Sequence, residues 1–166
     1  MVGTKLRRLV LISLSLSVAL VISAVAPTEV AAQGTPNGRK TLVGAWFNTV
    51  TPTLVEPFVG LGTFSADGGV TNISSVSLGA PLESPGYGQW VKTGPDTYAV
   101  TFLTISADAA GHHTLTSKVR ANLRVSANGD DFIGDFQVDF FDPGGALLVS
   151  DTGIVTGTRI KVEPLP

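Results

Sequence analysis

The chain contains no cysteine and few charged residues. Without cysteine it can have no disulfide framework, no thiolate nucleophile, no cysteine-bound zinc and no lipid-modified cysteine. Charged residues make up 14% of the sequence, whereas an average globular protein has about 25%. Long surface helices are therefore not expected, and stability must come from packing and from hydrogen bonding within sheets.

Glycine and proline, in contrast, are abundant, with 19 and 10 copies among 166 residues. This composition is typical of a chain with many turns, and the length suits one domain. Removing residues 1–32, which contain three basic residues and one acidic residue, leaves 8 basic and 12 acidic residues. A mildly acidic domain without a basic stripe is a poor nucleic-acid binder.

The first 32 residues read as a signal peptide. Basic residues at positions 5, 7 and 8 precede an apolar run over residues 9–26, which is the usual order in an export signal. Small residues predict cleavage after Ala32, with cleavage after Ala26 as the alternative. A retained membrane anchor is the competing interpretation, and the two small-residue sites argue against it.

The sequence therefore predicts a secreted or periplasmic protein that is not held at a membrane once the signal is removed. Residues 33–40 are polar and rich in glycine and proline, which indicates a flexible leader. Residues 41–166 are expected to form a single domain.

Apolar residues in this domain alternate with a period of two rather than 3.6, which predicts β-strands. In the clearest strand, 132–140, the apolar face alternates with Asp135, Gln137 and Asp139. Residues 115–125 alternate in the same way, and Asn128-Gly129 between the two segments is a strong hairpin signal. The two polar faces would then lie side by side, with basic residues 118, 120 and 124 near Asp135 and Asp139.

Turn signals rich in glycine, aspartate and proline divide the domain into eight candidate strands. The expected fold is all-β, an eight-stranded antiparallel up-and-down barrel, because closing such a meander removes its exposed edges. The last strand is long enough to contain a bulge near Gly153. The expected strands span residues 42–51, 58–65, 69–77, 87–93, 97–106, 113–126, 132–141 and 147–161.

Short motifs at the two ends of the domain resemble the lipocalins and the wider calycin superfamily. Gly44-x-Trp46 lies at the start of the first strand, and Arg159 lies near the end of the last. The resemblance implies that the tryptophan closes the floor of the barrel and packs under the basic residue. An arginine can stack on an indole and at the same time bind nearby carbonyls.

The sequence also departs from that family, because it lacks a second motif of the Thr-Asp-Tyr type and an obvious C-terminal helix. A barrel of the kind found in allene oxide cyclases and dirigent proteins is therefore the alternative. The segment from Ser84 to Trp90 resembles a family of small bacterial secreted proteins, and that likeness implies no activity.

No catalytic, metal or cofactor signature stands out. His112 and His113 are the only histidines, and adjacent strand residues face opposite ways, so they are not expected to ligate one metal. No Gly-x-Ser-x-Gly elbow or pair of catalytic carboxylates is evident. We therefore expect no cofactor, no metal and no catalytic residue, and the chain does not look like an enzyme.

Aromatic residues on the strands are the candidates for ligand binding. An eight-stranded barrel is just wide enough to be filled by side chains or to hold one small ligand. The binding hypothesis predicts an apolar cavity of at least about 300 Å³, and glycines on the strands either leave it room or serve as bend points. For the expected strand 97–106 the sequence does not decide which residues face inward, because Leu103 and Ile105 are as apolar as Phe102 on the opposite face, which also includes Thr104. The candidate ligand residues are Tyr87, Trp90, Phe102, Phe136 and Phe140.

The favoured function is non-enzymatic binding or carriage of a small apolar molecule. One alternative is a cyclase-type barrel enzyme, for which Tyr87, Tyr98 and Arg159 are the only inward ionisable or phenolic candidates. Another is a structural or adhesion module with a solid core. The sequence predicts neither the ligand's identity nor the oligomeric state.

Overall fold

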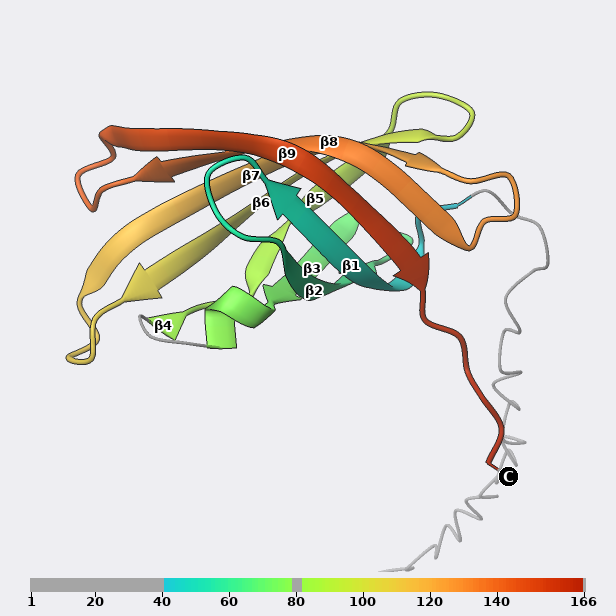
Figure 1. Ribbon diagram of the computed structural model, residues 1–166, viewed down its shortest axis with the longest axis horizontal. Helices are drawn as coiled ribbons and strands as arrows, with labels where there is room; N and C mark the ends of the chain where they lie inside the picture. Colours follow the sequence, from blue (N-terminus) through green and yellow to red (C-terminus); the bar gives the residue numbers. More distant parts are fainter. Residues whose placement is uncertain (1–40, 79–81, 166) are drawn as a thin grey trace, which may run out of the picture. The chain divides into compact units, whose positions relative to one another are not determined.

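A computed structural model describes residues 41–78 and 82–165, and the predicted signal peptide and leader lie outside this range (Figure 1). Nearly all described residues belong to strands or to the turns between them, with one short 3-10 turn, η1 (Ser75–Leu78). The strands are β1 (Gly44–Pro52), β2 (Phe58–Phe64), β3 (Gly69–Ser74), β4 (Leu82–Glu83), β5 (Gly86–Lys92), β6 (Thr97–Ala107), β7 (His113–Val125), β8 (Asp131–Phe141) and β9 (Leu147–Arg159).

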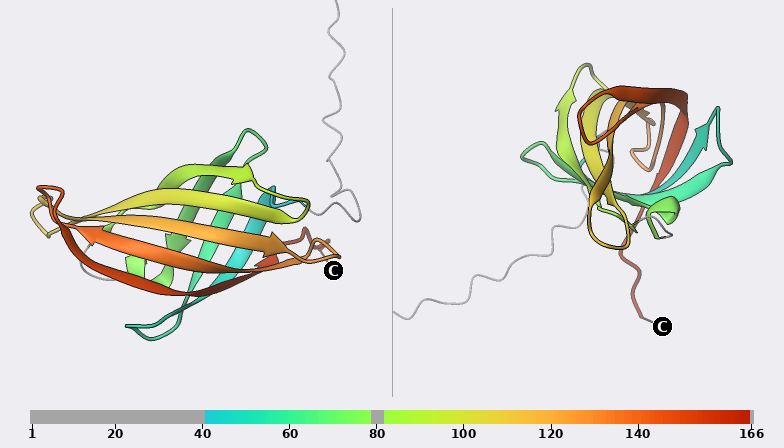
Figure 2. Two further views of the ribbon diagram at one scale, coloured as in Figure 1. Left: turned by 90° about the horizontal axis from the view of Figure 1, so that it is seen from above. Right: turned by 90° about the vertical axis from the view of Figure 1, so that its left-hand side faces the viewer.

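The sheet is a closed antiparallel barrel. Apart from β4, each strand pairs with the next one along the chain, with β3 pairing to β5, and β1 also pairs with β9, which joins the two ends of the meander. The short β4 pairs with β6 beyond the point where β5 begins, so β4 and β5 together form one interrupted strand of the barrel. The predicted all-β, eight-stranded up-and-down barrel is thus confirmed (Figures 1 and 2).

The interruption between β4 and β5 follows from a Ser-Pro pair. Pro85 has no amide hydrogen and so cannot donate to the ladder with β6. Ser84 substitutes for part of that ladder: its amide donates to the carbonyl of Ile105 at 2.8 Å, and its Oγ accepts from the amide of Ile105 at 3.1 Å. The chain can therefore bend at this point without leaving the wall of the barrel.

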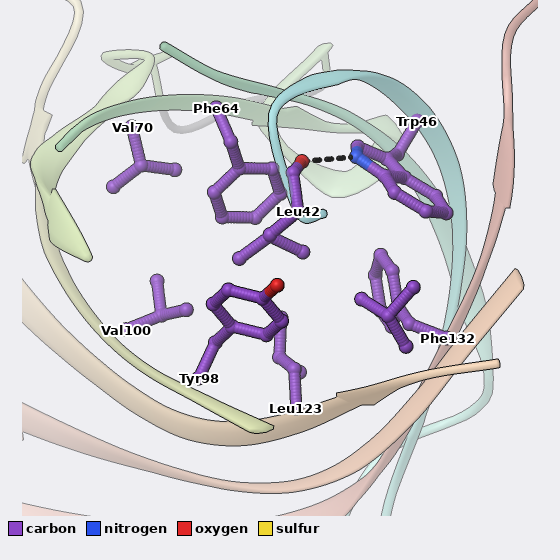
Figure 3. Close-up of a cluster of buried hydrophobic side chains, with 9 residues drawn as sticks. Leu42, Trp46, Phe64, Val70, Tyr98, Val100, Leu123 and Phe132 are labelled. Atoms are coloured by element: carbon purple, nitrogen blue, oxygen red, sulfur yellow. Dashed lines mark hydrogen bonds between the residues drawn. The ribbon is translucent and has the colours of Figure 1, made fainter. Parts of the chain in front are cut away.

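The barrel has two unlike ends. We call the end formed by turns 65–68, 93–96 and 126–130 the closed end, because the hydrophobic core lies there. The end formed by segments 53–57, 75–78, 82–85, 108–112 and 142–146 is the open end, at the left of Figure 1. The labelled core side chains in Figure 3 point toward one another from all sides of the barrel. The core consists of Leu42, Trp46, Phe64, Val70, Tyr98, Val100, Leu123, Val125 and Phe132.

The structure decides the phase of β6, which the sequence left open. Phe102 and Thr104 face the interior, and Leu103 and Ile105 are exposed on the outer wall. On the neighbouring hairpin, the predicted charge pairing is present as an ion pair between Arg120 and Asp139.

The expected bulge near Gly153 is wrong. Pairing of β9 with β1 and β8 runs without a break through that glycine, and the register shifts instead between Phe140 and Phe141, where Leu148 is left unpaired. Gly153 serves a different purpose, because a Cβ there would overlap the carbonyl of Thr51 and lie 2.8 Å from the ring of Phe136. Gly153 therefore allows β1 to lie close to β9, and it does not mark the extra residue of a bulge.

Candidate functional site

The motif residues at the two ends of the domain meet at the closed end. Trp46 is fully buried, and its indole nitrogen donates to the carbonyl of Leu42 at 2.8 Å (Figure 3). The guanidinium carbon of Arg159 lies 4.2 Å from the centre of the Trp46 ring, within the range of a cation–π contact. The two side chains meet because Trp46 and Arg159 are direct partners in the ladder between β1 and β9.

Arg159 also ties three chain segments together. Its Nε donates to the carbonyl of Gly129 at 2.8 Å, and its two terminal nitrogens donate to the carbonyls of Val43 and Thr41, each at 2.7 Å. Burial lowers the pKa of Arg159, and the charge of Asp130 acts in the opposite direction. Because an arginine keeps its proton in proteins, this cation binds the carbonyls of the entering chain and of the β7–β8 turn.

Gly44 completes this arrangement. Its φ of +134° lies in a region that other residues rarely adopt, and a Cβ there would lie 2.5 Å from Nη1 of Arg159. Gly44, Trp46 and Arg159 therefore form one structural unit, and this unit closes the barrel at the closed end.

Tyr98 lies buried in the same core, and its burial has a consequence for alkaline stability. Burial raises the pKa of the Tyr98 phenol above 10.0, although a backbone hydrogen bond from Leu42 acts in the opposite direction. A raised folded-state pKa adds stability that is complete below the unfolded pKa of 10.0 and is lost as pH rises through the folded value.

We therefore expect the wild-type protein to lose stability above pH 10 more steeply than Tyr98→Phe, measured as urea midpoints across pH 8 to about 11.5. Tyr87→Phe is the matched control, because the side chain of Tyr87 is 63% exposed on the outer wall. Equal slopes for the wild type and Tyr98→Phe would contradict the expectation.

The structure separates the five residues proposed to bind a ligand. Tyr87 points outward and does not reach the interior. Trp90 is at the closed end, where its indole donates to the carbonyl of Ser65 at 3.0 Å and lies edge-on to Tyr98 at 5.6 Å. The other three face the interior farther along: Phe102 on β6, and Phe136 and Phe140 on β8.

The interior glycines do not leave open room beside these rings. A Cβ at Gly86 would lie 2.6 Å from the ring of Phe102, and one at Gly88 would lie 2.7 Å from the Cβ of Phe102. Gly157 is likewise covered by the ring of Phe132. The glycines therefore accept neighbouring rings and close strand contacts and do not open a cavity at these positions.

A polar cluster lines one wall of the interior toward the open end. We define the polar cluster as Glu83, Thr104 and Ser117. Thr104 Oγ1 donates to Glu83 Oε1 at 2.7 Å, and Ser117 lies directly opposite Thr104 in the ladder between β6 and β7. Ser117 is only 4% exposed, and its Oγ has no hydrogen-bond partner in the described structure. A buried hydroxyl without a partner is unusual and costly.

Asn48 and Asp151 also face the interior. Asn48 on β1 is 5% exposed, and its Oδ1 has no partner within the described residues. Asp151 on β9 accepts hydrogen bonds from the amide of Thr53 at 3.3 Å and from its hydroxyl at 2.5 Å. The hydroxyl of Thr53 is the main cause that lowers the pKa of Asp151, so the carboxylate is charged at neutral pH.

Our sequence reasoning missed these polar residues, although the signal was present. Asn48 lies two residues after Trp46, and Ser117 lies two before Val119, so period-two alternation places each on the inward face. The apolar members of each face dominate the alternation, and the polar residues between them share the same face.

Large aliphatic side chains are exposed around the open end. They come from the β1–β2 loop, from η1 and β4, and from the start of β9, whereas the three turns at the closed end contain none. An apolar rim of this kind is typical of a binding surface. We define the apolar rim as Leu54, Val55, Val76, Leu82, Leu147, Leu148 and Val149.

Two hollows lie along the walls of the barrel. One, of about 760 Å³, follows β6 to β9 and is lined by outward residues such as Thr101, Arg120 and Gln137 as well as by Phe136. The other, of about 420 Å³, follows β2, β3 and β5. Each takes its lining from one wall only, so both are open grooves. The enclosed apolar cavity expected for a carrier stays a prediction.

The two histidines lie apart from this interior. His112 Nδ1 is 3.1 Å from Asp108 Oδ2 in the β6–β7 turn, and His113 Nε2 is 3.0 Å from Thr116 Oγ1. Among residues 41–78 and 82–165, no three acidic or histidine side chains gather in a group that could hold a metal ion.

Comparison with known proteins adds no family to this description. No protein-family model matches the chain, and no curated protein is significantly similar to it. Within the described residues, no helix is long and apolar enough to span a membrane. The functional argument therefore depends on the barrel and on the residues that line it.

Proposed function

We propose that this protein is an exported, lipocalin-like barrel that binds or carries a small, largely apolar molecule outside the cytoplasm. The ligand would enter at the open end and lie against Phe102, Phe136 and Phe140. Export is supported by the order of basic, apolar and small residues in the first 32 positions. The likeness to lipocalins is supported by the contact of Arg159 with Trp46.

The observation that carries the proposal is the buried hydroxyl of Ser117, without a partner in the described structure, on the side of the interior that faces the apolar rim. At the closed end, the hydrogen-bonding groups of Trp46 and Arg159 bind backbone carbonyls. Toward the open end, the hydroxyl of Ser117 is buried without a partner, and the apolar rim surrounds the entrance. A polar group buried without a partner requires an explanation, and a ligand that pairs with it supplies one.

The cyclase-type enzyme has less support. Of its three candidate residues, Tyr87 is on the outer wall, Tyr98 is packed in the core and Arg159 is engaged with three carbonyls. An adhesion module with a solid core would not need the polar cluster or the buried hydroxyl of Ser117. We therefore favour the carrier.

A tryptophan placed at the entrance tests the proposal. Trp46 and Trp90 both lie at the closed end, so Phe140→Trp supplies a reporter on the inward face of β8 near the open end. We expect its emission to shift to shorter wavelength when a neutral apolar compound such as dodecanol is added, because the ligand displaces water from the indole.

Ile133→Trp is the matched control, because Ile133 is on the same strand but exposed on the outer wall. Its emission should not respond. An unchanged Phe140→Trp spectrum up to the solubility limit of dodecanol, or an equal response from both variants, would argue against an interior ligand.

A further inference from the structure

In the described part of the chain, the ionisable side chains that face the open half of the interior are acidic. Glu83 lies at the interior wall, where it is hydrogen-bonded to Thr104. Asp151 faces inward from β9, which is on the opposite side of the barrel in the strand order. Among the described residues, the lysine and arginine side chains lie elsewhere: Arg159, Lys92 and Lys161 at the closed end, and those of β7 on the outer face.

The described segments around the entrance strengthen this asymmetry. Glu56, Asp108 and Asp142 belong to the loops of the open end, and none of the described residues in those loops is lysine or arginine. Acidic groups on low-dielectric walls attract cations and repel anions. An anionic ligand such as a fatty acid would meet a repulsive field on entering.

The hydroxyl of Ser117 points independently to a ligand at this place. Its Oγ is buried beside the Thr104–Glu83 hydrogen bond and has no partner in the described structure. An ammonium group offers three N–H donors and a positive charge, so one such group would bond to Ser117 and also lie close to the Glu83 carboxylate. A hydroxyl ligand could accept from Ser117 and donate to Glu83, but it brings no positive charge to the carboxylate, so an amine should bind more tightly.

We infer that the ligand is a cationic amphiphile, whose protonated amine binds at the polar cluster and whose hydrocarbon chain extends along Phe102 and Phe136. This inference rests on the proposed function, because it specifies the chemistry of the molecule held in the same interior. The apolar rim guides the chain inward, and Asp151 adds to the attraction from the opposite wall.

Three straight-chain compounds that differ only in the head group test the inference. Dodecylammonium, dodecanol and dodecanoate are titrated calorimetrically into the mature wild-type protein at pH 7, below their critical micelle concentrations. We expect dodecylammonium to bind at one site at least about tenfold more tightly than dodecanol, with dodecanoate the weakest. This preference should shrink as salt is added, because salt screens the acidic groups.

Two variants assign the preference to the polar cluster. Glu83→Gln has nearly the same shape and should remove most of the preference for the amine, whereas Ser117→Ala should weaken dodecylammonium more than dodecanol. Asp67→Asn is the matched control, since it removes a negative charge from the closed-end turn between β2 and β3 and should leave binding unchanged.

The outcomes separate this inference from the proposed function. If the three compounds bind equally, or if dodecanoate binds most tightly, the interior is still a ligand site, but the inferred preference for a cationic head group is wrong. If Asp67→Asn lowers dodecylammonium affinity as much as Glu83→Gln, the attraction is general rather than local, and the assignment to the polar cluster fails. If none of the three binds, both the inference and the proposed function are overturned.

Discussion

Replacing Trp46 with alanine is expected to lower the free energy of unfolding by about 3 to 5 kcal/mol, as large-to-small substitutions of core aromatics do. Trp46 is fully buried, its ring lies 4.9 Å from that of Phe132, and its indole nitrogen binds the carbonyl of Leu42. The alanine variant would lose these contacts and leave Arg159 without the ring that it stacks on. Urea denaturation followed by circular dichroism measures the change.

Two variants make the Trp46 result specific. Phe47→Ala changes the next residue of β1, whose side chain is 47% exposed on the outer wall, and should cost less than about 1 kcal/mol. Trp46→Phe keeps a ring but removes the N–H donor, so its cost should fall between the other two. An unchanged midpoint for Trp46→Ala would remove the structural argument for the lipocalin-like floor.

The fold could be predicted from sequence because both determinants of a meander are local. Alternation of inward and outward residues marks each strand, as in Phe132, Phe136 and Val138, and turn residues mark where a strand ends. Closure of the barrel could also be predicted, since a long last strand needs a partner and β1 is the remaining edge. Strand bounds agree with expectation to within a few residues.

What the sequence could not supply depends on contacts between distant strands. A bulge near Gly153 is a reasonable expectation for a glycine in a long strand, yet the approach of Thr51 explains that glycine instead. The two-residue β4 is too short to show periodicity, and it forms because Ser84 supplies hydrogen bonds to β6. Register across strands decides such details, and one-dimensional patterns do not contain it.

The candidate site could be predicted from the sequence only in part, for a similar reason. The aromatic face of β8 identified Phe136 and Phe140 as inward residues, whereas Tyr87 lies on the outer wall because β5 pairs so that Gly86, Gly88 and Trp90 face inward. The polar cluster joins Glu83 of β4, Thr104 of β6 and Ser117 of β7 through pairing between strands. No motif in the chain brings these three residues together.

Replacing Arg159 is expected to have the second large effect on stability. Arg159→Met keeps much of the length and apolar volume of the side chain but leaves the carbonyls of Thr41, Val43 and Gly129 without their donors. Buried acceptors without partners cost about 1 to 3 kcal/mol each, and water reaches part of this site, so we expect a loss of about 2 to 4 kcal/mol.

Arg159→Lys separates the charge from the geometry. A lysine keeps the positive charge, but its single ammonium group cannot reproduce the planar fork that reaches three carbonyls, so this variant should be intermediate in stability. Lys161→Met is the matched control, because Lys161 is exposed near the same end of the chain and pairs only with Asp130 among the interactions described. Its loss should be below about 1 kcal/mol, as for other surface ion pairs. If Arg159→Met and Lys161→Met have equal urea midpoints, then Arg159 does not hold the closed end together, and the stability of the barrel must come from the apolar core alone.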